Sequence, residues 1–172
     1  MSYDWLKNEK SPKILVEAVK QIGIKEIVGS KHNPVILEWA DEVGLKKVYT
    51  NDEIPWCGLF IAHCTHIAGL QAVERPLWAL NWAKYGNKVD EPMLGDILTF
   101  KRNGGGHVGI YVGEDATHYH VLGGNQNNSV SISRIAKSRL HQARRTAWKV
   151  AQPVNVRKVF LEAKGVITTN EQ

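Results

Sequence analysis

In the first half of the chain, apolar residues recur at helical spacing between polar stretches. Proline begins these stretches and glycine follows most of them, which is typical of helix starts and stops. The pattern predicts helices between Pro12 and Gly23, between Pro34 and Gly44, from about Pro55 to Gly69, and from Pro76 to Tyr85.

After Pro92 the spacing of apolar residues changes to two, and turns bearing Gly, Asn or Asp separate short alternating stretches. These predict strands over residues 96–100, 107–113, 117–123 and 129–135. The connections are too short for crossover helices, so the strands should form an antiparallel meander. Helices followed by strands predict an α+β fold with the helices on one sheet face. Residues 140–151 and 155–163 are ambiguous, and we expect them to be partly helical.

The size and composition of the chain suit one globular domain spanning residues 1–172. The polar start "MSYDWLKNEKSPK" lacks the features of a secretory signal, so we expect synthesis in the cytoplasm without Sec export. Residues 54–73 lack Asp, Glu, Lys and Arg over a length that could span a bilayer. Their polar residues, including two histidines, favour a buried helix instead.

The net charge of +5 is unevenly distributed. Residues 134–164 contain nine Lys or Arg and one acid, a local charge of +8, whereas residues 1–133 have a net charge of −2. This basic segment favours nucleic acid, acidic lipid or the anionic polymers of a bacterial envelope, and a solvated face without a partner explains it equally well. No reader helix, zinc finger or RNA-binding aromatic signature accompanies it, so we expect no nucleic-acid role.

Two cysteines lie on the predicted third helix, Cys57 at its start and Cys64 on its apolar stripe. Their separation, about 10.5 Å along a helix axis, is too great for a disulfide. Cys64 is expected to be a core residue. A metal site is disfavoured because neither HExxH nor a paired CxxC is present. The ligands considered with Cys57 are His63, His66, His118 and His120.

Cys57 is also a candidate nucleophile. The helix start supplies unpaired N–H groups and a partial positive charge, which predict a lowered pKa for the thiol and an oxyanion site. His107, the candidate base, begins a strand after three glycines. Alternation assigns His107 and Tyr111 to an open face rich in small residues, and directs Val108, Ile110 and Val112 into the core. A structural histidine is the alternative.

The stretch "HVLGGNQNNS" offers a third element. An amide at Asn125 or Gln126 could accept the imidazole N–H and fix its tautomer. Asn and Gly are also ordinary turn formers, so these residues alone do not decide between the two roles.

Taken in order, "HNPVILEWADEVG", "IPWCGLFIAHCTHIAG", "LGDILTF", "GHVGIYVG" and "VLGGNQNNSV" resemble the NlpC-type and CHAP (cysteine, histidine-dependent amidohydrolase/peptidase) enzymes. The similarity is to the small single-domain branch of phages and bacteria, and it covers roughly residues 15–145. These enzymes belong to the papain-like superfamily, so the resemblance implies a papain-like α+β fold.

The resemblance also implies a cysteine peptidase or amidase that cleaves peptidoglycan without a cofactor. Carried over residue by residue, Cys57 matches the nucleophile and His107 the general base. Asn125 best matches the polar third position, with Gln126 second, while Gly123 stands where some CHAP enzymes have Glu. Asp96 matches a structural position. The groove is expected to include Trp56, Trp82 and Tyr111.

These features predict a monomeric phage endolysin that acts on the cell wall after release, with the basic segment binding anionic envelope polymers. Two alternatives remain open. One is an antibacterial effector or tail-associated lysin with the same chemistry. The other is a non-catalytic, cell-wall-binding papain-like module.

Overall fold

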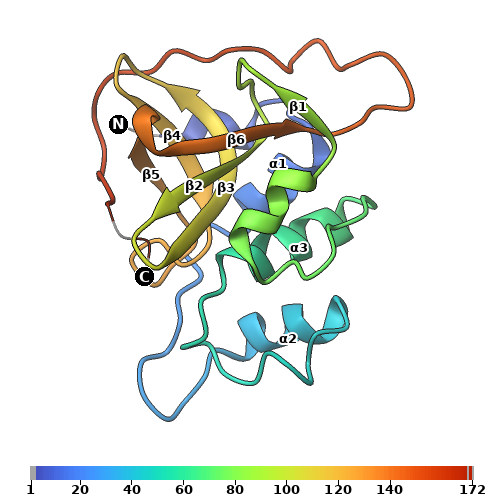
Figure 1. Cartoon of the computed structure of the whole chain (residues 1–172), viewed down its shortest axis with the longest axis vertical. Coiled ribbons are helices and arrows are strands. Elements are labelled where there is room, and N and C mark those ends of the chain that lie inside the picture. Colours follow the sequence, from blue (N-terminus) through green and yellow to red (C-terminus); the bar gives the residue numbers. More distant parts are fainter. Residues whose placement is uncertain (1–2, 170, 172) are drawn as a thin grey trace.

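The computed structural model describes residues 3–169 and 171. Within these residues the chain forms three α-helices, three short 3-10 helices and one six-stranded sheet, so the predicted α+β class is confirmed (Figure 1). The helical elements are η1 (Asp4–Lys7), α1 (Lys13–Lys20), α2 (Pro34–Glu42), α3 (Cys57–Ile67), η2 (Ala79–Lys84) and η3 (Lys137–Arg139).

All neighbouring strands of the sheet are antiparallel, in the order β1-β6-β2-β3-β4-β5. The strands are β1 (Asn87–Val89), β2 (Ile97–Arg102), β3 (Gly105–Glu114), β4 (His118–Gly123), β5 (Ser131–Ala136) and β6 (Leu140–Arg145). The meander β2 to β5 is as predicted. The fourth predicted helix is the shorter 3-10 helix η2.

The expectation of helix after residue 140 is wrong, because residues 140–145 form β6 between β1 and β2. Their sequence, LHQARR, has weak strand propensity, and tertiary contacts determine its structure. Arg145 forms an ion pair with Asp96 at 2.8 Å, and Arg144 donates a hydrogen bond to the Gly86 carbonyl at 2.8 Å. Residues 155–163 contain no helix either.

Apolar residues pack on both faces of the sheet. The larger cluster joins the helices to the sheet and includes Val108, Ile110 and Val112, as predicted. The prediction of an open opposite face is wrong, since the strands curve around a second cluster there (Figure 1). That cluster consists of Leu98, Phe100, Tyr111, Tyr119, Val121, Ile135 and Ala143.

The segment after β6 runs back along the outside of the sheet (Figure 1). Single parallel bridges join Glu114 to Phe160 and Arg134 to Ile167. An ion pair of 2.9 Å between Arg157 and Glu9 connects the same segment to the beginning of the chain. None of the described helices is long and apolar enough to cross a membrane.

Candidate active site

Cys57 is the first residue of α3, at the helix start that the sequence predicts. The residue after it must be small, because a Cβ on Gly58 would lie 2.2 Å from the Pro76 carbonyl oxygen. The chain at Pro76 and Leu77 therefore crosses directly over the beginning of the helix. Gly58 allows this close approach, which builds one wall around Cys57.

Burial raises the pKa of the Cys57 thiol, which corrects the predicted lowering. The backbone N–H groups of Val108 and Gly58 hydrogen-bond to the sulfur and the nearby Arg102 carries a positive charge, and both lower the pKa without offsetting burial. Val108 follows His107 in β3, so the sulfur lies against the strand that carries the candidate base. No hydrogen bond joins the sulfur to Nδ1 of His107 among the described residues.

The imidazole of His107 has two different environments. Nε2 lies 3.0 Å from Oε1 of Gln126. The amide nitrogen of Gln126 donates to the carbonyls of Val121 at 3.1 Å and Ser131 at 2.6 Å, so Oε1 is left as an acceptor. His107 must then carry its proton on Nε2, and the neutral ring presents a lone pair at Nδ1. Nδ1 is buried and has no hydrogen-bond partner among the described residues.

Burial lowers the pKa of His107 to about 4. The carboxylate of Glu171 and the hydrogen bond to Gln126 act in the opposite direction but are outweighed. At neutral pH the thiol and the imidazole are therefore both uncharged. An imidazole with a free Nδ1 can accept the thiol proton when the surroundings become more polar.

Two glycines explain how Gln126 reaches His107. A Cβ on Gly123 would lie 2.9 Å from Gln126 Oε1 and 3.1 Å from His107 Nε2. A Cβ on Gly124 would lie 2.8 Å from the Trp56 ring. The loop after β4 therefore packs tightly between the base and the start of α3. The glycine at 123, where some CHAP enzymes have Glu, is what this packing requires.

Asn125 was the preferred third residue, and the structure corrects this choice. The side chain is buried, the backbone is left-handed (φ 58°), and no hydrogen bond joins it to His107 within the described residues. Its Oδ1 is buried and unpaired there. The turn directs the next side chain, that of Gln126, toward His107 instead.

The three residues predicted to line a groove, Trp56, Trp82 and Tyr111, are each fully buried, so that prediction is wrong. Their polar atoms bond internally: the indole N–H groups to Glu26 and the Pro76 carbonyl, and the Tyr111 hydroxyl to Glu114. The sequence prediction missed Trp78, which is 71% exposed. The chain has six tryptophans, and the residues next to Trp78 in the sequence do not distinguish it from the buried ones.

Trp78 belongs to the segment that borders the candidate site. Its neighbour Leu77 lies against Gly58, and Leu80 packs so closely on Gly106 that a Cβ there would lie 2.5 Å from the Leu80 side chain. The segment thus touches the residues next to Cys57 and next to His107, and it presents an aromatic ring to solvent beside them.

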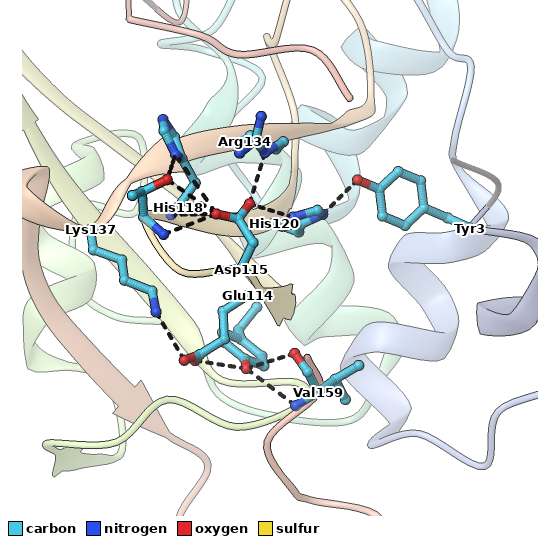
Figure 2. Close-up of polar contacts among 10 residues, drawn as sticks. Tyr3, Glu114, Asp115, His118, His120, Arg134, Lys137 and Val159 are labelled. Atoms are coloured by element: carbon cyan, nitrogen blue, oxygen red, sulfur yellow. Dashed lines mark hydrogen bonds and ion pairs between the residues drawn. The ribbon is translucent and has the colours of Figure 1, made fainter. Parts of the chain in front are cut away.

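A second polar cluster joins β4, β5 and the beginning of the chain (Figure 2). His120 contacts the Tyr3 hydroxyl at 2.7 Å and the Asp115 carboxylate at 3.0 Å, and Arg134 binds the same carboxylate at 2.8 Å. Burial alone would raise the pKa of Asp115, but hydrogen bonds from Arg134, Thr117, His120 and His118 hold it well below its usual range. Because both His120 nitrogens are occupied, we interpret this cluster as structural.

Among residues 3–169 and 171, no group of three or more His, Cys, Asp or Glu side chains could hold a metal ion. Three of the candidate ligands, His63, His118 and His120, have carboxylate partners. His63 Nδ1 lies 2.7 Å from Glu42, and His118 lies beside Asp115. Cys64 is fully buried in the main core, as predicted, and no disulfide joins it to Cys57.

The basic segment, residues 134–164, is largely neutralised. In the part of the chain that the structure describes, seven of its nine cationic side chains form ion pairs with carboxylates. The local charge of +8 counted along the sequence therefore overstates the positive field in space, because most of the partners lie outside the segment.

No family model matches the chain, and no curated protein matches it significantly.

Proposed function

We propose that the chain is a papain-like cysteine hydrolase that cleaves an amide bond of bacterial peptidoglycan. One observation carries the proposal: a helix-start cysteine whose sulfur bonds the backbone beside a histidine with a free Nδ1 and a Gln-bound Nε2. The helix start that carries the thiol therefore meets the strand that carries a candidate base and its orienting amide.

In the proposed reaction, His107 Nδ1 accepts the thiol proton and the Cys57 sulfur attacks the substrate carbonyl. Backbone N–H groups at the start of α3 stabilise the oxyanion. The imidazolium returns its proton to the leaving amine, and a thioester forms as the C–N bond breaks. His107 then takes a proton from water, the hydroxide attacks the thioester, and the acid and the free thiol are regenerated.

The substrate class rests on the ordered resemblance to NlpC-type and CHAP enzymes and on the papain-like fold that this resemblance implies. A phage endolysin that lyses its host is the biological role that we propose with it. Anionic envelope polymers remain the proposed partners of residues 134–164, although internal ion pairs leave fewer charges to bind them.

Clearing of a suspension of purified sacculi tests the proposal. Cys57→Ala should abolish clearing, whereas Cys64→Ala, a matched control that removes the other thiol, should retain it if the variant folds. Circular dichroism and a melting curve establish folding of both. Clearing by folded Cys57→Ala would contradict the proposal.

A non-catalytic cell-wall-binding module is the second candidate, and the burial of Cys57 and His107 favours it. The two candidates differ in thiol reactivity. An enzyme that opens to admit substrate exposes a reactive Cys57, so iodoacetamide should modify it faster than Cys64 near neutral pH. Equal inertness of both thiols, together with sacculus binding, would favour the module. An effector or tail-associated lysin would share the enzyme's chemistry.

A further inference from the structure

Glu171 is a buried carboxylate held by a single arginine. Its side chain is fully covered, and both of its oxygens accept hydrogen bonds from Arg139 at 2.8 Å. This two-pronged geometry is the way in which guanidinium groups recognise carboxylates in general, including those of ligands. Arg139 also donates to the Thr168 carbonyl at 3.2 Å, which fixes the chain leading to Glu171.

Strand β2 lies between the pair and the strand that carries the candidate base. Phe100 in β2 is opposite His107 on one side and Leu140 on the other, and its ring stacks on the imidazole at 6.5 Å between centroids. Arg139 directly precedes Leu140 and donates to the Lys101 carbonyl at 3.3 Å. Burial lowers the pKa of His107, and the carboxylate of Glu171 acts in the opposite direction with a smaller effect, consistent with this proximity.

The described part of the segment carrying Glu171 lies along β5, at the edge of the sheet. Backbone hydrogen bonds run from the Arg134 N–H to Val166 and from the Thr168 N–H to Arg134. Because substrate must reach the buried Cys57 and His107, some covering element has to move. A short, edge-bound segment needs less free energy to detach than a strand within the sheet.

We propose that Arg139 forms a carboxylate-binding subsite across β2 from His107, and that Glu171 fills this subsite in the resting protein. The inference rests on the proposed function and deepens it. The substrate is then an acidic peptide with a carboxylate close to the scissile amide, and it displaces Glu171 when it binds. Glu171 acts as an internal competitor.

Alkylation of Cys57 tests the subsite without any substrate. In both iodoacetamide and iodoacetate the sulfur displaces iodide, but only iodoacetate brings a carboxylate. Peptide mass spectrometry measures the rate at Cys57 for the unmodified protein, Glu171→Gln, Glu171→Asp and Glu171→Gln/Arg139→Gln. Glu162→Gln is the matched control, since this exposed glutamate pairs only with a neighbouring lysine in the described structure.

Loss of the charged, bidentate contact in Glu171→Gln should raise alkylation by both reagents roughly tenfold. The ratio of the iodoacetate rate to the iodoacetamide rate should also rise several-fold, and removal of Arg139 should reverse that rise. Glu171→Asp should restore most of the protection because it keeps the charge, and Glu162→Gln should match the unmodified protein.

Unchanged alkylation in folded Glu171→Gln would overturn the proposal. An equal rise for both reagents, unaffected by Arg139→Gln, would overturn the carboxylate subsite. If Glu171→Gln does not fold, Arg139→Lys takes its place, because it keeps the positive charge but loses the two-pronged contact with Glu171. Faster alkylation of Cys57 in folded Arg139→Lys supports the proposal, and an unchanged rate overturns it. Failure of the proposed function looks different: sacculi then stay intact with every variant, whatever the alkylation rates.

Discussion

Gln126 binds Nε2 of His107 and leaves Nδ1 without a partner among the described residues. The amide of Gln126 is itself fixed by two backbone carbonyls, so it cannot rotate to offer its nitrogen to the imidazole. One side chain therefore sets both the tautomer and the orientation of the candidate base.

This relationship predicts a difference between two adjacent residues. Gln126→Ala should lower kcat for sacculus hydrolysis by roughly 10- to 100-fold with little change in KM, because the ring loses its orientation. Asn125→Ala should have a smaller effect. The pH profile of kcat/KM distinguishes a role in orienting the His107 imidazole from a purely structural role. The profile should shift in Gln126→Ala and stay in place in Asn125→Ala. A larger loss in Asn125→Ala would contradict the assignment.

The buried imidazole predicts acid sensitivity. Because the pKa of His107 is about 4 in the folded protein and about 6.5 when unfolded, its contribution to stability is intact above pH 6.5. It is lost as the pH falls from about 6.5 to 4, where the unfolded chain binds the extra proton. Between pH 7 and pH 4.5 this should cost about 2 kcal/mol.

Urea unfolding at the two pH values measures that loss, with His107→Gln as the variant that cannot take up the proton. The variant should show a smaller decrease in unfolding free energy between pH 7 and pH 4.5 than the unmodified protein. Equal decreases would mean that other groups cause the acid sensitivity.

Two tryptophans on one segment should behave oppositely. Trp78 is exposed beside the site and Trp82 is fully buried. Trp78→Ala should reduce kcat/KM on sacculi with little change in the melting temperature, since an exposed ring can stack on substrate. Trp82→Ala should instead destabilise the fold by about 3–5 kcal/mol. Unchanged kinetics in Trp78→Ala would remove this ring from the proposed substrate surface.

The loop after β4 should tolerate no added side chain at Gly123. Gly123→Ala puts a Cβ against Gln126 and His107 and should lower activity well before the protein unfolds. Gly105→Ala, at the beginning of β3, is the matched control because nothing lies within 4 Å of its Cβ. Activity assays at a temperature below both melting transitions make the comparison. Equal activities would show that the loop can move aside.

Salt dependence tests the proposed partners of the basic segment. Binding to sacculi through free cations should weaken steeply from low to high ionic strength. Since seven of the nine cationic side chains in residues 134–164 pair with carboxylates in the described structure, the expected dependence is shallower than a charge of +8 would give. Binding that does not respond to salt would exclude this segment as an envelope anchor.

The elements with strong local signals were predictable. Pro34 begins α2, Cys57 begins α3, and the alternation of Val108, Ile110 and Val112 assigns them to the helix-facing core. β6 was not predictable, because its residues become a strand only between two neighbouring strands.

The candidate site was predictable in part. Helix-start and strand patterns are enough to make Cys57 and His107 candidates. The choice between Asn125 and Gln126 depends on a left-handed turn that the sequence does not determine. The pKa of Cys57 was assigned the wrong direction because burial, a tertiary property, outweighs the helix start. The pairing of Glu171 with Arg139 has no sequence signal.

Mass spectrometry of muropeptides released from purified sacculi in ¹⁸O-labelled water tests the central claim most directly. The account predicts that the protein and its Glu171→Gln variant release fragments with one new carboxyl group that carries a single ¹⁸O atom, left by hydrolysis of the thioester. Cys57→Ala should release none. Labelled fragments from folded Cys57→Ala, or none from either the protein or Glu171→Gln, would contradict the account.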